Sequence, residues 1–138
     1  MPYESTGRSR KALSWVLQFL VAGVFLQTLY FKFTAAPESV WIFTTLGLEP
    51  WGRLGAGVTE LVATILILTP RTVWIGAMLA LAIMAGAIAS HLTRLGVEVM
   101  DDGGLLFGLS LIVFLGSAGI LILRKDEIPR LARTAPKD

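Results

Sequence analysis

Residues 104–123 read GLLFGLSLIVFLGSAGILIL, a run without a charged side chain that ends at Arg124. A helix needs about 20 mostly apolar residues to cross the hydrocarbon of a bilayer. Residues 12–33, 54–69 and 72–93 are also predominantly apolar. Backbone groups in lipid must be hydrogen-bonded within the chain, so such segments span the membrane as helices. The sequence therefore predicts an all-α fold, a four-helix transmembrane bundle.

The composition supports a lipid environment and narrows the possible chemistry. Of the 138 residues, 54% are hydrophobic and 16% charged, with a mean hydropathy of +0.70. A soluble domain of this size has too little interior to bury that much apolar surface. The chain has no cysteine and one histidine, His91. This excludes disulfides, iron–sulfur clusters, thiolate metal sites and a histidine-cluster zinc site. We expect no metal site and no intrinsic cofactor.

The positions of the basic residues predict the orientation. Nine of the twelve Lys and Arg lie on the side of the bundle that carries both termini, so the positive-inside rule places the termini in the cytoplasm. We expect a multi-pass protein of the inner (plasma) membrane, with a cytoplasmic N-terminal segment (1–11), a transmembrane domain (12–123) and a loose, basic cytoplasmic tail (124–138). Since the basic residues flank apolar segments, we expect a lipid bilayer and no nucleic acid as partner.

Two further features concern the first helix and its connection to the second. The apolar run 12–33 is longer than the 7–15 residues typical of a signal-peptide core, so we expect it to remain as a membrane helix. The connection 34–52 is long and not polar. Pro37 and Gly47 could open and close a short amphipathic helix there, at the outer interface or over the mouth of the bundle. Trp41 suits that depth.

Small residues recur at a spacing of four, as in Gly76 and Ala80. Such pairs allow close helix packing, either within one bundle or between two copies. In a chain this rich in Gly and Ala we favour packing within the bundle, and a homo-oligomer stays open.

Ionisable residues at membrane depth are the main functional candidates, because they are costly there. Glu60, Lys32 and His91 are the three such residues, and the predicted topology brings all of them to the outer layer. We expect a polar pocket open to the outside, roofed by residues 37–47, with Lys32–Glu60 as its ion pair. The cytoplasmic half is expected to have no comparable buried set. The candidate ligand-binding residues are Lys32, Glu60, His91, Arg94, Gln27, Thr28, Thr64 and Trp41.

Each of these residues also has a structural interpretation. Lys32 can extend to the interface, Glu60 can form a structural pair, and His91 can be a hydrogen-bonded interface residue. As a functional set, an ammonium, a carboxyl and an imidazole can hydrogen-bond a quinone carbonyl and shuttle its protons. They can equally bind an anion or relay protons in transport. No nucleophile motif, phosphate loop or HExxH pair is present, so catalytic residues cannot be assigned.

The pattern resembles the DoxX family of small four-helix bacterial membrane proteins over about residues 12–123. The resemblance rests on Tyr-Phe-Lys-Phe (30–33), Phe-Thr-Thr-Leu-Gly-Leu (43–48), Gly-Val-Thr-Glu-Leu (57–61), Ile-Leu-Ile-Leu-Thr-Pro (65–70) and His91. The family is named for a subunit linked to thiosulfate:quinone oxidoreduction, and some members are thought to hold partner enzymes at the membrane. Any thiol role in relatives cannot operate in a chain without cysteine.

The leading functional hypothesis is a subunit or accessory protein of a quinone-linked (thiosulfate or sulfur) redox system. Its polar pocket would bind a small molecule, with a quinone as the possible cofactor and another redox subunit as partner. One alternative is a membrane scaffold that docks a soluble oxidoreductase through the basic tail. Another is a small transporter that oligomerises to form a path. Whether the protein is an enzyme is left open by the sequence.

Overall fold

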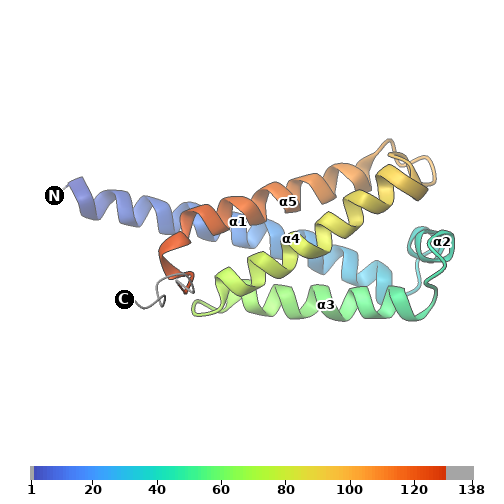
Figure 1. Ribbon diagram of the computed structural model, residues 1–138, viewed down its shortest axis with the longest axis horizontal. Helices are drawn as coiled ribbons and strands as arrows, with labels where there is room; N and C mark the ends of the chain where they lie inside the picture. Colours follow the sequence, from blue (N-terminus) through green and yellow to red (C-terminus); the bar gives the residue numbers. More distant parts are fainter. Residues whose placement is uncertain (1, 130–138) are drawn as a thin grey trace, which may run out of the picture.

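The computed structural model describes residues 2–129, and side chains from Thr6 onward. The described part of the chain is all-helical and contains no strand. Its helices are α1 (Pro2–Phe33), α2 (Pro37–Thr45), α3 (Trp51–Leu68), α4 (Val73–Ser90), the π-helical turn η1 (His91–Leu95), α5 (Leu105–Leu123) and the 3₁₀ turn η2 (Lys125–Glu127). Figure 1 shows α1, α3, α4 and α5 as one elongated bundle, with α2 at one end.

Four helices are long and apolar enough to cross a membrane, within Thr6–Phe33, Trp51–Leu68, Val73–Leu95 and Leu105–Leu123. The predicted four-helix bundle with a short helix between its first two members is therefore confirmed. The main difference in helix bounds lies in α1, which begins ten residues before the predicted span at residue 12. No proline interrupts residues 3–11, and Ser, Arg and Lys there are compatible with a helix. The first turns of α1 project beyond the other helices (Figure 1).

The four long helices pack as a square in which α1 contacts α3 and α5, and α4 contacts the same two. The centre of the bundle is mainly apolar, and its buried apolar residues are Val21, Phe25, Ala63, Ile67, Val73, Ala77, Ala80, Met84, Val113 and Ile120. Large apolar side chains such as Phe19, Ile65 and Leu115 are exposed on the outer surface. An apolar surface on all sides is what a helix bundle presents to lipid acyl chains.

The α3–α4 hairpin shows why small residues are needed inside the bundle. A Cβ atom added to Gly76 would lie 2.6 Å from the backbone nitrogen of Ile67 on the facing helix, which is closer than real Cβ contacts allow. Ala80, one turn later, is fully buried. This small-residue pair packs within one bundle, which is the alternative that the sequence analysis favoured. The Thr72 hydroxyl donates to the Leu66 carbonyl across the turn at 2.9 Å and holds it closed.

The short helix α2 lies at the end of the bundle opposite the described chain ends, where it contacts α1, α3 and η1. Pro37 occupies its first turn, and Gly47 follows it with a φ of +73°, a left-handed conformation that glycine adopts without strain. The predicted opening and closing residues are therefore the ones that bound this segment. We call this the α2 end of the bundle, and the opposite one the terminal end.

Candidate functional site

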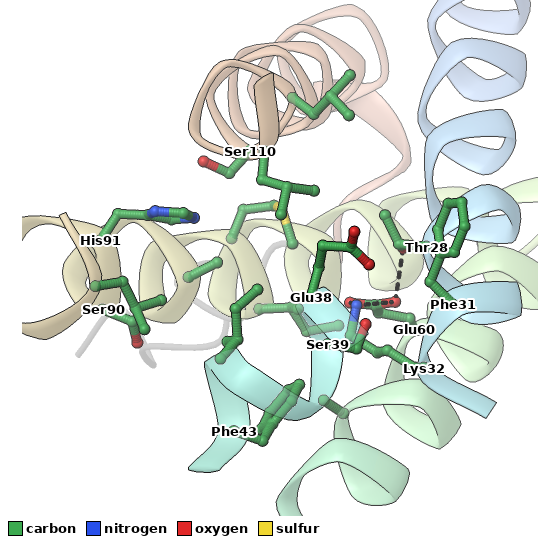
Figure 2. A pocket seen from close by; sticks show the side chains of 18 of the residues that line it. Thr28, Phe31, Lys32, Glu38, Ser39, Phe43, Glu60, Ser90, His91 and Ser110 are labelled. Carbon is green, nitrogen blue, oxygen red and sulfur yellow. Dashed lines mark hydrogen bonds and ion pairs between the residues drawn. The ribbon is translucent and has the colours of Figure 1, made fainter. Parts of the chain in front are cut away.

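An ion pair between α1 and α3 lies at the α2 end. The Lys32 ammonium (Nζ) is 2.9 Å from Oε1 of Glu60 and 3.2 Å from its Oε2. The Thr28 hydroxyl, one turn below Lys32, lies 3.0 Å from Glu60 Oε2 and 3.0 Å from the Phe25 carbonyl, so its proton can be donated to either. Three of the predicted site residues therefore form one hydrogen-bonded cluster (Figure 2).

Burial makes this cluster energetically significant. The Glu60 side chain is 3% exposed and that of Lys32 14%. Removing a charge from water is expensive, and close pairing with additional hydrogen bonds offsets part of the cost. Each charged group therefore depends on the other to offset its lost hydration. The Lys32 ammonium has three protons, and Glu60 is its one acceptor among the described residues, so a further donor remains for a ligand.

Arg53, at the start of α3, fixes the backbone that carries Lys32. Its guanidinium donates to the Lys32 carbonyl and to both Glu49 carboxylate oxygens, at 2.9 and 3.1 Å. Arg53 is itself buried. As a charge just before an apolar run, Arg53 looks in the sequence like a residue that only flanks a membrane span. Its spacing of four from Glu49 was the available signal, since helical neighbours at that distance face each other.

A cavity of about 520 Å³ opens beside this cluster, below α2. Every long helix contributes to its wall: Val24 and Phe31 from α1, Ala56 from α3, Met84 and Ala87 from α4, and Leu106 and Leu109 from α5. The roof comes from α2, with Ser39, Ile42 and Phe43. Figure 2 shows Lys32 and Glu60 on one side of this space and His91 across it. The wall is thus mainly apolar, with a few polar groups at separate points.

His91 marks the point where α4 changes to the π-helical turn η1. Its Nδ1 is 2.9 Å from the Gly96 carbonyl, and its ring makes an edge contact with Phe107 at 5.4 Å between centroids. A carbonyl only accepts, so Nδ1 carries the proton. In the neutral ring, Nε2 then has a free lone pair. No described residue hydrogen-bonds to Nε2, and the ring points into the cavity (Figure 2). Irregular helical turns of this type are frequent at functional sites.

Asp102 shapes the loop that follows η1 and also contributes to the cavity wall. Burial by itself would raise the pKa of this carboxyl, but the net pKa lies below the usual value. The backbone N–H groups of Leu106, Val99 and Gly104 donate to its oxygens at 3.0, 3.0 and 2.8 Å, and the charge of His91 acts in the same direction. Asp102 thus supplies the acceptors that the first turn of α5 needs.

Four of the predicted site residues lie outside this cavity. Gln27 and Arg94 are exposed on other helix faces, and Trp41 lies on the outer face of α2 with 38% exposure. Thr64 is buried, but its hydroxyl donates to the backbone carbonyl of Glu60 at 2.8 Å and not to the carboxylate. The structure therefore brings together Thr28, Lys32 and Glu60, and places His91 across the cavity from them.

The expectation that the other half of the bundle has no buried polar set is wrong. At the terminal end, Gln18 accepts from the Ser14 hydroxyl at 2.8 Å and from Arg124 at 3.1 Å, and donates to the Ile67 carbonyl at 2.8 Å. Arg124 also donates to Ser14 at 2.7 Å, and all three side chains are buried. The spacing of Ser14 and Gln18 by four residues within an apolar run was the signal for this cluster. Arg124 was interpreted only as the end of a span. Residues 130–138 of the predicted tail lie outside the described part.

Together these features define an integral membrane protein of four spanning helices, with an apolar cavity at one end and an ion pair in its wall. A comparison with models of protein families matches residues 16–113 to the DoxX-like family. The chain belongs to this family, as the sequence motifs indicated. The matched part contains the ion pair, the cavity roof and His91. Comparisons with curated proteins and with solved structures gave no significant match.

Proposed function

We propose that the protein binds a quinone-type ligand in the cavity at the α2 end, as a membrane component of a quinone-linked redox system. The observation that carries this proposal is the distribution of polar groups in the cavity. A free donor, the Lys32 ammonium, lies on one side, and a free acceptor, Nε2 of His91, lies across from it. The surface between them is mainly apolar, and Glu38, Ser39 and Ser110 add further polar groups to it.

The size and lining of the cavity agree with such a ligand. Small-molecule sites are usually clefts of about 300–1,000 Å³ with mostly apolar walls and a few placed polar groups. This cavity has about 520 Å³ and is lined by Phe25, Phe43, Leu46 and similar side chains. A quinone combines a flat ring with an apolar tail, and it dissolves in the bilayer that surrounds the bundle. The location and the polarity of the cavity therefore favour a ligand of this type.

The hydrogen-bonding groups favour the reduced form. Lys32 donates to one oxygen of the ring in either redox state. When the His91 ring is neutral, the lone pair of Nε2 can accept a hydrogen bond from a hydroxyl of the quinol, whereas the carbonyl of the oxidised quinone has no proton to donate. We therefore expect the quinol to bind more tightly than the quinone. In such a redox system, a partner protein would supply or take up the electrons of the bound ligand.

The test is a titration of the detergent-purified protein with a short-chain quinol under anaerobic conditions and, separately, with the matching quinone. Lys32→Met and His91→Phe each remove one hydrogen bond to the ligand, so each is expected to weaken quinol binding about 10- to 100-fold. Arg94→Gln is the matched control: Arg94 is charged and close to His91 in sequence but lies outside the cavity. It is expected to leave the affinity unchanged.

Two results would contradict the proposal. One is the absence of saturable binding of either form to the wild type, which would move the interpretation to a scaffold and direct the next experiment to partners captured from native membranes. The other is an equal loss of affinity in Arg94→Gln and in the two cavity variants, since a general effect on the membrane-embedded fold would then explain the data.

A further inference from the structure

A second cavity, of about 270 Å³, lies at the terminal end of the bundle, between the first turns of α1 and the end of α5. Arg10 and Lys11 stand at its α1 side, and Arg124, Asp126 and Glu127 at the side of α5 and η2. It is separate from the cavity proposed for the quinone, which lies at the opposite end. Its position and its charged lining therefore indicate a separate ligand site.

Some charged side chains of this cavity have hydrogen-bond or ion-pair partners within the described chain, and others have none. The Arg124 guanidinium donates to Ser14, Gln18 and Glu127, so its hydrogen-bonding capacity serves the fold. Arg10 and Lys11 are exposed and make no hydrogen bond or ion pair within the described chain. The cavity lining contains one acidic side chain that has no ion pair, Asp126, and two such cations. The cavity therefore carries an excess positive charge that the described protein does not neutralise.

The depth of the cavity identifies the surroundings of these cations. Arg124 ends the apolar run of α5, and Arg10 and Lys11 precede the apolar part of α1. They therefore lie at the level where the hydrocarbon ends and lipid headgroups begin. Directly deeper on the same two helices, the apolar side chains of Leu13, Val16 and Ile122 are exposed. A ligand held here can place a charged group on the cations and an apolar part along the helices.

We propose that this cavity binds the phosphate headgroup of an anionic phospholipid, with Arg10 and Lys11 as the binding residues. Arginine offers paired N–H groups that fit a phosphate oxygen pair, and lysine adds a point charge. Basic pockets between membrane helices bind anionic headgroups by this means. The Arg124 network forms the floor of the site and positions it, while Leu13 and Ile122 contact the acyl chains. The inference does not depend on the proposed quinone site.

The test measures lipid retention. The full chain is placed in bilayer discs of equal parts phosphatidylglycerol and phosphatidylcholine, extracted in mild detergent, and analysed by native mass spectrometry. The wild type is expected to keep phosphatidylglycerol in preference to phosphatidylcholine. Each basic residue near an anionic headgroup strengthens binding about fivefold, so Arg10→Ala/Lys11→Ala should weaken retention about 25-fold. Both residues are exposed and make no hydrogen bond or ion pair within the described chain, so this variant should unfold like the wild type.

Arg8→Ala/Arg71→Ala is the matched control, because it removes two positive charges from the same end of the bundle but none from the cavity lining. Its retention of phosphatidylglycerol is expected to equal that of the wild type. An equal loss in both double variants would indicate diffuse attraction to the surface and overturn the proposal, as would a wild type without preference between the two lipids. Displacement of the lipid by excess inorganic phosphate would show a site for free phosphate and would also refute a lipid site.

Discussion

Replacing Lys32 with methionine removes the charge that faces the buried Glu60 carboxylate while keeping most of the volume of the side chain. The two charged groups are 2.9 Å apart at their closest atoms. Two unit charges about 4 Å apart attract by about 4 kcal/mol at an effective dielectric constant near 20, before desolvation is subtracted. Loss of one partner from a buried pair typically costs about 3–5 kcal/mol. Because Lys32 is 14% exposed at a cavity, we expect about 3 kcal/mol for Lys32→Met.

Glu60→Gln is expected to cost less, about 1 kcal/mol. The new amide can still accept from Thr28, and the freed Lys32 can extend toward the membrane interface. The double variant leaves no unpaired buried charge, so its loss should be about 2 kcal/mol, below the sum of the single losses. The double-mutant cycle therefore predicts a coupling of about 2 kcal/mol between the two residues.

The assay is reversible unfolding of the four proteins in mixed micelles of increasing SDS content, which yields the free energy of unfolding for each. Lys125→Met serves as control, since Lys125 is exposed and unpaired among the described residues, and it should change the free energy by less than about 0.5 kcal/mol. A coupling below about 0.5 kcal/mol would refute the reasoning, because the pair would then contribute nothing beyond two independent side chains.

Three further predictions use the same unfolding assay. Arg124→Met leaves the buried acceptors of Gln18 and Ser14 without their charged donor and should cost about 2–3 kcal/mol, whereas a loss as small as that of Lys125→Met would contradict the network. Gly76→Ala forces a Cβ against the Ile67 backbone and should cost about 1–3 kcal/mol, while Gly23→Ala, with open space around it, should not destabilise; equal effects would contradict the close packing of α3 and α4. Asp102→Asn should cost about 1 kcal/mol at neutral pH. Folding lowers the pKa of Asp102, so its contribution is present above the usual value of 3.8 and is lost as the pH falls through the lowered pKa. The variant should therefore lose part of the acid sensitivity that the wild type shows below pH 3.8, and an unchanged pH profile would refute that role.

The sequence was a good guide to the position of a residue along the membrane normal. Apolar length defines each span, and a residue's distance from the span end gives its depth. Lys32 and Glu60 were predicted to share a layer on this basis, and the structure has them in contact. The short helix that begins at Pro37 followed from turn and cap residues, whose backbone preferences are local.

The direction in which a side chain points around its helix was harder to predict. In a soluble protein the apolar face identifies the core, but in lipid both the core face and the outer face are apolar. Gln27 lies one position from Thr28, and only Thr28 faces the cavity. Arg94 lies three positions after His91, but it lies outside the cavity that His91 lines. The reason is that η1 departs from regular α-helical geometry at that point. The depth of a residue in the membrane could be inferred from the sequence. The rotation of a helix about its axis could not, because it depends on which helices pack beside it.

The polar network at the terminal end has a consequence for biogenesis. Ser14 and Gln18 belong to α1, yet their partner Arg124 follows 110 and 106 residues later. At the α2 end, Lys32 meets Glu60 after only 28 residues, as soon as the second spanning helix is inserted. Both ends of α1 can therefore bind α3 early, the terminal end through Gln18 and the Ile67 carbonyl, but the charged donor of the terminal end is added only when α5 is inserted. A chain interrupted before α5 would keep the bonds among Ser14, Gln18 and Ile67 but would lack the charged donor that completes this buried network.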